Sequence, residues 1–178
     1  MPSRDQLNPN AIRAHLANKT VSHWGLAEFL GKAPQMGETY PITVDYNMTL
    51  EEMIAVGHYD WKNEDITSKN FQAVGTGKVG LDAQLIHYGK NMGSEAVLAD
   101  LGQRGLRSAT IAELLVFGAK YPELQRQFSI VELGSVAQIG DDRCVACLVR
   151  GDRQRCLCLS WFGHVWDADY RFLAFRKS

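Results

Sequence analysis

Four cysteines close to the C-terminus are the residues of this chain best suited to chemistry. They are Cys144, Cys147, Cys156 and Cys158, with His164 following shortly after. Thiolates at such short spacings can complete a tetrahedral zinc shell, so a small zinc-binding module is one alternative function. However, the CVAC stretch lacks the glycine of a zinc knuckle, and free cysteine is often simply buried. We therefore predict no metal and no cofactor.

A glycine-rich stretch, GTGKVG from Gly75 to Gly80, matches the spacing of a nucleotide-binding loop. No convincing strand precedes it and no long helix follows it, and Val79 stands where a phosphate loop needs Ser or Thr. It is better explained as a turn that leads into a strand. The scattered histidines also lack a second ligand at metal spacing. We predict no catalytic residue, and a protein that is not an enzyme.

Size and composition favour a single domain. The chain has 178 residues, of which 46% are hydrophobic, and this is enough for a core without disulfides. Its net charge of -1 argues against a general nucleic-acid binder. The sequence contains neither a secretory signal nor an apolar run of the roughly 20 residues that span a bilayer. We expect a soluble, cytoplasmic protein with no membrane span.

Hydrophobic periodicity and capping residues predict helices first and short strands later. Helices are expected within residues 11–31, 49–57, 94–105 and 110–122, with capping boxes at Thr49–Glu52 and Thr110–Glu113 and an N-cap at Ser94. Strands are expected at 40–46, 81–87, 130–133, 145–149, 156–161 and 171–176, with an extended loop at 58–72. This order indicates an α+β fold with no break between domains.

The C-terminal stretch from residue 134 to residue 176 contains no Lys, no Glu and no Met. Within it, Leu157, Leu159 and Trp161 have the spacing of a strand face turned toward a core. The alternate residues Cys156, Cys158, Ser160 and Phe162 would face outward, and they share neither size nor chemistry. A surface whose residues can vary explains this better than a shared catalytic task. The alternative is chance, since strands are poor in Lys and Glu anyway.

Two motifs give the chain a resemblance to a known fold. Arg107, Thr110 and Glu113 follow the pattern R-x-x-T-x-x-E at a helix start, and Arg171, Phe172 and Arg176 follow RF-x-x-x-R in a closing strand. In this layout the chain resembles C-type-lectin-fold domains of formylglycine-generating enzymes and of variable proteins of diversity-generating retroelements. The resemblance implies short antiparallel strands in the C-terminal half and helices mainly in the first two thirds. Residues 1–104 would brace a lectin-like core at 105–178 within a single domain, 1–178, and residues 134–176 would be its variable region.

The retroelement branch of the resemblance implies a ligand-binding display protein. In such systems template adenines are copied with errors, mostly at AAC-type codons, and codons ending in C or T encode neither Lys, Glu nor Met. A formylglycine-generating-type enzyme is a further alternative, but the crowded cysteines do not match its cysteine pair. The implied scaffold residues are Val145, Leu148, Leu157, Leu159, Trp161, Trp166, Phe172 and Leu173. The implied variable, ligand-binding positions are Asp141, Asp142, Arg143, Val149, Arg150, Asp152, Arg153, Arg155, Cys156, Cys158, Ser160, Phe162, His164, Asp167, Asp169 and Tyr170.

The side chains of this expected surface favour a protein ligand. The expected surface places Arg143, Arg150, Arg153 and Arg155 beside the aromatic residues Phe162, His164 and Tyr170. Arginine and aromatic side chains supply most anchoring energy at protein interfaces. An anionic ligand, nucleic acid included, is an alternative that the net charge does not favour. The sequence predicts neither the ligand's identity nor the oligomeric state.

Overall fold

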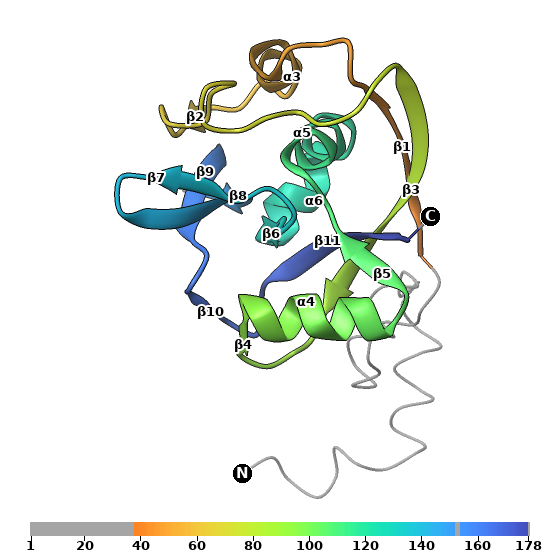
Figure 1. The fold of residues 1–178 in the computed structure, drawn as a ribbon, viewed down its shortest axis with the longest axis vertical. Coiled ribbons are helices and arrows are strands. Elements are labelled where there is room, and N and C mark those ends of the chain that lie inside the picture. The colour runs from red at the N-terminus through yellow and green to blue at the C-terminus, as the bar shows by residue number, and fades with distance from the viewer. Residues whose placement is uncertain (1–37, 152–153, 178) are drawn as a thin grey trace, which may run out of the picture. The chain divides into compact units, whose positions relative to one another are not determined.

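The computed structural model of the protein describes residues 38–151 and 154–177 (Figure 1). All of the described residues belong to one compact unit. The helix expected within residues 11–31 lies outside the described residues, as do Asp152 and Arg153.

The described residues form four helices, three of which match the expected helical segments. They are α3 (Leu50–Val56), α4 (Ser94–Gln103), α5 (Ile111–Lys120) and the short α6 (Pro122–Gln127), which begins at a proline. The Thr49–Glu52 capping box is confirmed in both directions: the Thr49 amide donates to the Glu52 carboxylate at 2.8 Å, and the Glu52 amide donates to the Thr49 hydroxyl at 3.2 Å. At Thr110–Glu113, the Thr110 amide donates to the Glu113 carboxylate at 2.7 Å. These contacts pair amides that a helix start leaves without an intrahelical acceptor.

Ser94 has a different role from the N-cap that we expected. Gly93 is the N-cap of α4, and Ser94 is its first helical, buried residue. The Ser94 hydroxyl donates to the Phe162 carbonyl and accepts a 2.8 Å hydrogen bond from the Trp166 indole nitrogen. The Ser94 hydroxyl therefore joins the start of α4 to the C-terminal loop that follows the last long hairpin.

The strands form one large mixed sheet and one small antiparallel pair. Along the large sheet the order is β1-β3-β11-β6-β8-β9-β2, with β5 beside β11 and β7 beside β8, while β10 pairs with β4. Their bounds are β1 Tyr40–Asp45, β2 Trp61–Lys62, β3 Lys78–His87, β4 Met92–Gly93, β5 Leu106–Ser108, β6 Ile130–Val131, β7 Ala137–Ile139, β8 Asp142–Arg150, β9 Arg155–Trp161, β10 Val165–Trp166 and β11 Arg171–Arg176.

The fold is mixed, with helices and a large sheet, as an α+β class requires, but the expected distribution of strands is wrong. Four strands precede α4, and one of them, β3, has 10 residues and pairs with both β1 and β11. The strands are not all antiparallel either, because β11 runs parallel to β6 and β2 runs parallel to β9. The expected turn at Gly75–Gly80 does lead into β3, and Gly77 adopts a φ of 67° there.

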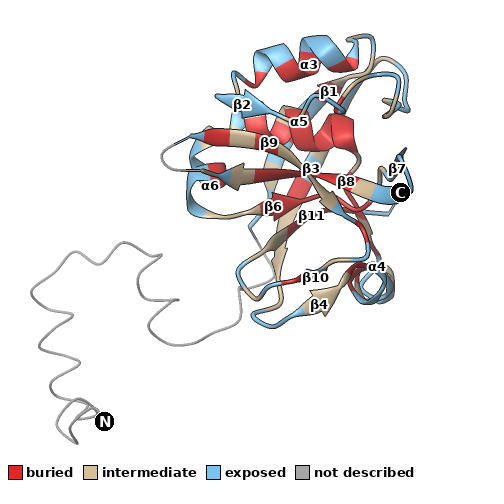
Figure 2. Ribbon diagram, turned by 90° about the vertical axis from the view of Figure 1, so that its left-hand side faces the viewer, coloured by how far each residue is buried: buried red, intermediate tan, exposed pale blue. Residues whose placement is uncertain are grey.

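Buried side chains gather in two clusters. The first packs around α5 and includes Phe117, Leu148 and Leu157. The second contains Val97 and Leu101 from α4 together with Trp166 and Phe172. In Figure 1, α4 lies on one side of β11 and α5 and α6 lie on the other. Figure 2 shows buried residues concentrated in α5 and in the strands next to it.

Candidate ligand-binding surface

The hairpin β8–β9 carries most of the candidate positions and has two distinct faces. Its strands pair antiparallel, with Cys147 opposite Cys158 and Leu148 opposite Leu157. Directly opposite residues share a face and successive residues alternate between faces. Leu148 and Leu157 belong to the cluster around α5, whereas Cys147 and Cys158 belong to the cluster that includes α4. We call these the α5-side face and the α4-side face.

The α5-side face contains most of the expected scaffold of this hairpin. Leu148 and Leu157 are fully buried, and Leu159 is half-buried against the same cluster, as expected. Trp161 differs, because its side chain is 58% exposed. Trp161 is the last residue of β9 and lies beyond the part of the strand that the core covers. Its side chain is therefore on the same face as Leu157 and Leu159 but is not buried.

The α4-side face carries the outward row expected from the sequence. Cys156, Cys158 and Ser160 are all half-buried, and we call these three residues the β9 row. Phe162 was expected to extend the row outward, but only 4% of it is exposed. It packs into the cluster that includes α4, and the Arg143 guanidinium lies 4.3 Å from the centre of its ring. Phe162 is therefore part of the scaffold.

Arg155, a second candidate that we expected to be exposed, is buried with 6% exposure. Its guanidinium donates to the carbonyls of Gly57 at 2.7 Å and Gly118 at 2.6 Å, and to the side-chain oxygen of Gln125 at 3.2 Å. Gly57 is the C-cap of α3, and Gly118 lies in the last turn of α5. Both carbonyls stand at the negative ends of helix dipoles, which compensates the buried cation. Arg155 holds β9 to two helices and does not face outward.

Trp61 belongs to the surface but was not predicted. It lies in β2, which runs parallel to β9 and places Trp61 beside Cys156. The shared register puts Trp61 at the end of the β9 row, and 49% of the side chain is exposed. The aromatic residues in the stretch 58–62 are unusual for a loop and could have drawn attention to this segment. However, β2 pairs with β9 across almost a hundred residues of sequence, and no local pattern encodes such a pairing.

Aromatic residues border the β9 row on its other side. The ring of Trp166 makes edge-to-face contacts with His164 and Tyr170, at centroid distances of 5.2 and 5.1 Å. Tyr170 and Cys158 both pack against the cluster that includes α4. Burial, followed by the neighbouring Cys147, Asp167 and Cys158, raises the pKa of Tyr170. The structure thus brings together the β9 row, Tyr170 and Trp61, with neutral polar and aromatic groups available for contact.

Other candidates lie further apart. Asp141 and Asp142 lie at the turn between β7 and β8, while Arg150 ends β8, which has nine residues. At about 3.3 Å per residue, the two ends of that strand are roughly 26 Å apart. Asp167 and Asp169 are exposed in the loop between β10 and β11, and Val149 is half-buried on the α4-side face. The candidates therefore do not form one continuous patch.

The four cysteines do not converge on a metal site. Cys144 lies on the α5-side face, three residues before Cys147 on the opposite face, and all four thiols are free. Within residues 38–151 and 154–177, no three His, Cys, Asp or Glu side chains form a group that could hold a metal ion. Burial raises the pKa of Cys158 to about 11 and that of Cys147 further, so both thiols are protonated at neutral pH. Neutral thiols are poor nucleophiles.

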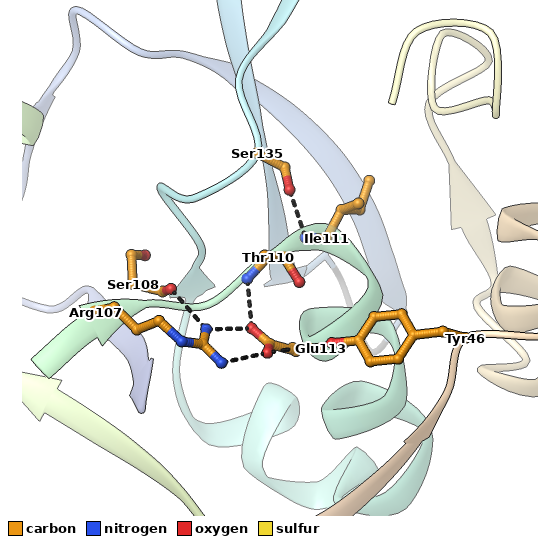
Figure 3. A network of polar contacts seen from close by, with 7 residues as sticks. All are labelled: Tyr46, Arg107, Ser108, Thr110, Ile111, Glu113 and Ser135. Carbon is orange, nitrogen blue, oxygen red and sulfur yellow. Dashed lines mark hydrogen bonds and ion pairs between the residues drawn. The ribbon is translucent and has the colours of Figure 1, made fainter. Parts of the chain in front are cut away.

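The residues of the R-x-x-T-x-x-E motif form a polar network at the start of α5 (Figure 3). Both guanidinium nitrogens of Arg107 donate to the carboxylate of Glu113, at 2.7 and 2.9 Å, and that carboxylate also accepts from the Thr110 amide. The Ile111 amide donates to the Ser135 hydroxyl at 2.9 Å. The network joins β5, α5 and the loop after β6, so its role is to support the fold.

Replacing Glu113 with glutamine is expected to lower the free energy of unfolding by about 1–3 kcal/mol. The change removes the charge of a buried carboxylate that pairs with Arg107 and accepts from the start of α5. Arg107 is 35% exposed, so water compensates part of the loss. Urea unfolding monitored by circular dichroism would measure it. The matched control is Glu123→Gln, which breaks the exposed Glu123–Arg126 pair and should cost less than about 0.5 kcal/mol. Equal costs for both variants would contradict a structural role for the network.

Neither a protein-family model, nor a curated protein, nor a solved structure matches this chain. Among the described helices, none combines the length and the apolar character needed to cross a bilayer.

Proposed function

We propose that this protein is a ligand-binding display protein on a C-type-lectin-like scaffold, and that a retroelement diversifies residues on its C-terminal surface. The proposed ligand is a protein. It would be bound by the β9 row together with the aromatic residues at its two ends, Trp61 and Tyr170.

The separation of scaffold and candidate positions by burial is the observation that carries this proposal. Every described candidate except Arg155 and Phe162 is half-buried or exposed. The scaffold residues, apart from Leu159 and Trp161, are buried. A side chain that contributes little to the core can be replaced at little cost in stability, and diversification requires this property.

Two further features support the proposed scaffold. Arg107, Thr110 and Glu113 meet in one network, and Arg171–Arg176 form the strand β11 that pairs with β3, β5 and β6. These are the two motifs that carry the resemblance, and both join elements that are distant in the sequence. A fold held by such contacts tolerates changes in the surface residues between them.

The burial of individual residues revises the set of positions proposed to vary. Arg155 and Phe162 leave the set because replacing either would disturb the core. Cys156, Cys158 and Ser160 remain as its centre, joined by Tyr170 and His164. The zinc module receives no support from the placement of the cysteines, and no described feature favours the enzyme alternative.

Sequencing the 3′ end of this gene across a natural population of its source cells would test the proposal codon by codon. We expect substitutions at Cys156, Cys158 and Ser160, and none at the intervening Leu157 or at Arg155 and Phe162. Positions expected to vary alternate with positions expected to stay constant along β9. A locally high mutation rate would affect both kinds of position, so variation at alternate positions only would indicate diversification. A gene that does not vary in this region, or one in which Arg155 varies as freely as Cys158, would refute the proposal.

A further inference from the structure

The outer edge of β9 is only partly covered by β2. The Phe162 amide donates to the Arg143 carbonyl at 2.7 Å, and the Gly151 amide donates to the Gln154 carbonyl at 2.9 Å. In this register, Cys156, Cys158 and Ser160 exchange backbone hydrogen bonds with β8. The backbone groups of Arg155, Leu157, Leu159 and Trp161 therefore point to the other side, toward the edge of the sheet.

The first half of that edge is occupied. Asp60 bonds to both backbone groups of Arg155, and the Asn63 amide donates to the Leu157 carbonyl at 2.9 Å. After Asn63 the chain leaves the strand. Among the described residues, none forms a hydrogen bond with the backbone amide or carbonyl of Leu159, or with the backbone amide of Trp161. The Trp161 carbonyl accepts a hydrogen bond from the His164 amide. Unpaired strand groups of this kind can bind another strand.

The surroundings of the open segment are acidic and aromatic. Glu64 and Asp65 follow Asn63 directly and are exposed, and Asp142 is exposed on the neighbouring strand. Burial, followed by the charges of Asp142 and Asp65, raises the pKa of the Cys144 thiol, and Cys144 is directly opposite Trp161. None of these three carboxylates is in an ion pair with another described residue. The nearby Arg143 places its guanidinium on the Phe162 ring, on the α4-side face.

The edge of β1 at the opposite end of the sheet order is better protected. Pro41 has no amide hydrogen, and its carbonyl accepts from the Tyr121 hydroxyl at 2.8 Å and from the Lys120 ammonium at 2.6 Å. Proline and lysine at an edge prevent strand addition. The open segment from Leu159 to Trp161 has an exposed tryptophan with carboxylates nearby, and Lys62 of β2 lies beside Leu157, in the covered half of the edge.

We propose that the open edge of β9 from Leu159 to Trp161 binds an extended, basic segment of a partner protein as an added strand. The segment's backbone would pair with the amide and carbonyl of Leu159 and with the amide of Trp161. Its Lys or Arg side chains would meet Glu64, Asp65 and Asp142, and an apolar side chain would cover the Trp161 ring. Added strands gain affinity from main-chain bonds and specificity from alternate side chains. Because backbone groups make the contact, this interaction goes beyond the proposed display surface and does not depend on diversification.

Binding of a synthetic hexapeptide of alternating lysine and valine, with blocked ends, to the full-length protein would test this inference. Amide exchange and chemical shifts of the ¹⁵N-labelled chain would be followed by NMR. At saturating peptide, the Leu159 and Trp161 amides should exchange at least about tenfold more slowly, as expected for amides that gain a hydrogen bond. Added salt should weaken binding.

Two control peptides and one pair of variants separate the components of the interaction. A peptide with aspartate in place of lysine should not bind, and neither should one methylated at the backbone nitrogens that face β9. Trp161→Pro removes the outward amide and should weaken binding at least about tenfold relative to Trp161→Phe, which keeps it. If Trp161→Pro fails to fold, the methylated peptide makes the same comparison on the unchanged protein.

Three results would overturn the proposal. The first is no protection of Leu159 and Trp161 at millimolar lysine–valine peptide. The second is equal binding of the aspartate peptide. The third is protection of these amides without peptide that increases with protein concentration, which would mean that a second copy of the chain occupies the edge. Variation of the gene in a population is measured separately, so failure of the peptide test leaves the display proposal unaffected.

Discussion

Replacing Arg155 with methionine is expected to lower the free energy of unfolding by about 3–5 kcal/mol. The guanidinium is buried and bonds to three oxygens from separate segments, Gly57, Gly118 and Gln125. Methionine fills much of the same space but donates no hydrogen bond. Two of the lost bonds go to carbonyls near helix C-termini, where a cation is favoured, so the variant loses electrostatic stabilisation as well.

Chemical denaturation of the full-length protein would measure this loss. The matched control is Arg150→Met, because Arg150 is directly opposite Arg155 in the hairpin but is exposed, and its one side-chain hydrogen bond within the described residues is long, 3.4 Å to the Arg126 carbonyl. The control should change stability by less than about 0.5 kcal/mol. Arg155→Lys should fall between the two, since one ammonium cannot reach three acceptors in different directions. Similar unfolding midpoints for Arg155→Met and Arg150→Met would show that Arg155 is not buried in solution.

Because of Glu132, the free energy of unfolding is expected to fall as the pH rises from about 4.5 to about 8. The side chain is fully buried, and its two oxygens accept from the Ser135 amide at 2.8 Å and the Ala146 amide at 3.4 Å. Burial raises the pKa of this carboxyl from 4.5 to about 8, against the opposing effect of the backbone hydrogen bonds. In the unfolded chain the same carboxyl ionises near 4.5.

The sign of the effect follows from which state holds the proton. Below pH 4.5 both states are protonated and the contribution of Glu132 to stability is fully present. Between the two pKa values the folded state binds the extra proton, so stability falls as pH rises, up to a limit of about 5 kcal/mol. Unfolding free energies at several pH values across this range would measure the slope.

Glu132→Gln should remove that slope, because glutamine has no proton to lose. The control Glu123→Gln, at an exposed position, should keep it. An unchanged slope in Glu132→Gln would mean that the two amide hydrogen bonds keep the carboxylate charged in the folded protein.

The local parts of the fold could be predicted from the sequence. Thr49–Glu52 and Thr110–Glu113 encode their helix starts within four residues, and the alternation around Leu157 encodes a strand and its buried face. Ser94 shows the limit of this reasoning. A serine before an apolar stripe predicts an N-cap, but distant contacts with Phe162 and Trp166 determine what its hydroxyl does.

The errors at the candidate surface have a common physical cause. Arginine on a strand next to a turn is usually exposed, and only the assembled ends of α3 and α5 make a buried site for Arg155. Strand alternation also gives no information about where the strand ends, which is why Trp161 and Phe162 were assigned the wrong burial. The position of Trp61 beside the β9 row could not be predicted, because it depends on the parallel pairing of β2 with β9, which are distant in the sequence. The faces on which the cysteines lie could have been predicted more easily. Once β8 is known to begin before Cys144, the odd separation between Cys144 and Cys147 places their thiols on opposite faces.

The hydroxyl of Ser94 bears on the proposed recognition surface, because it holds the segment between β9 and β11 that carries His164 and Tyr170. Bonds to Phe162 and Trp166 fix that segment to the start of α4. Under the proposed display function, a ligand that contacts this segment would meet a preorganised surface, and association would not incur the entropy loss of ordering it. Side chains exchanged at His164 or Tyr170 would then change affinity through the contacts that they make themselves, while the backbone that presents them keeps its shape.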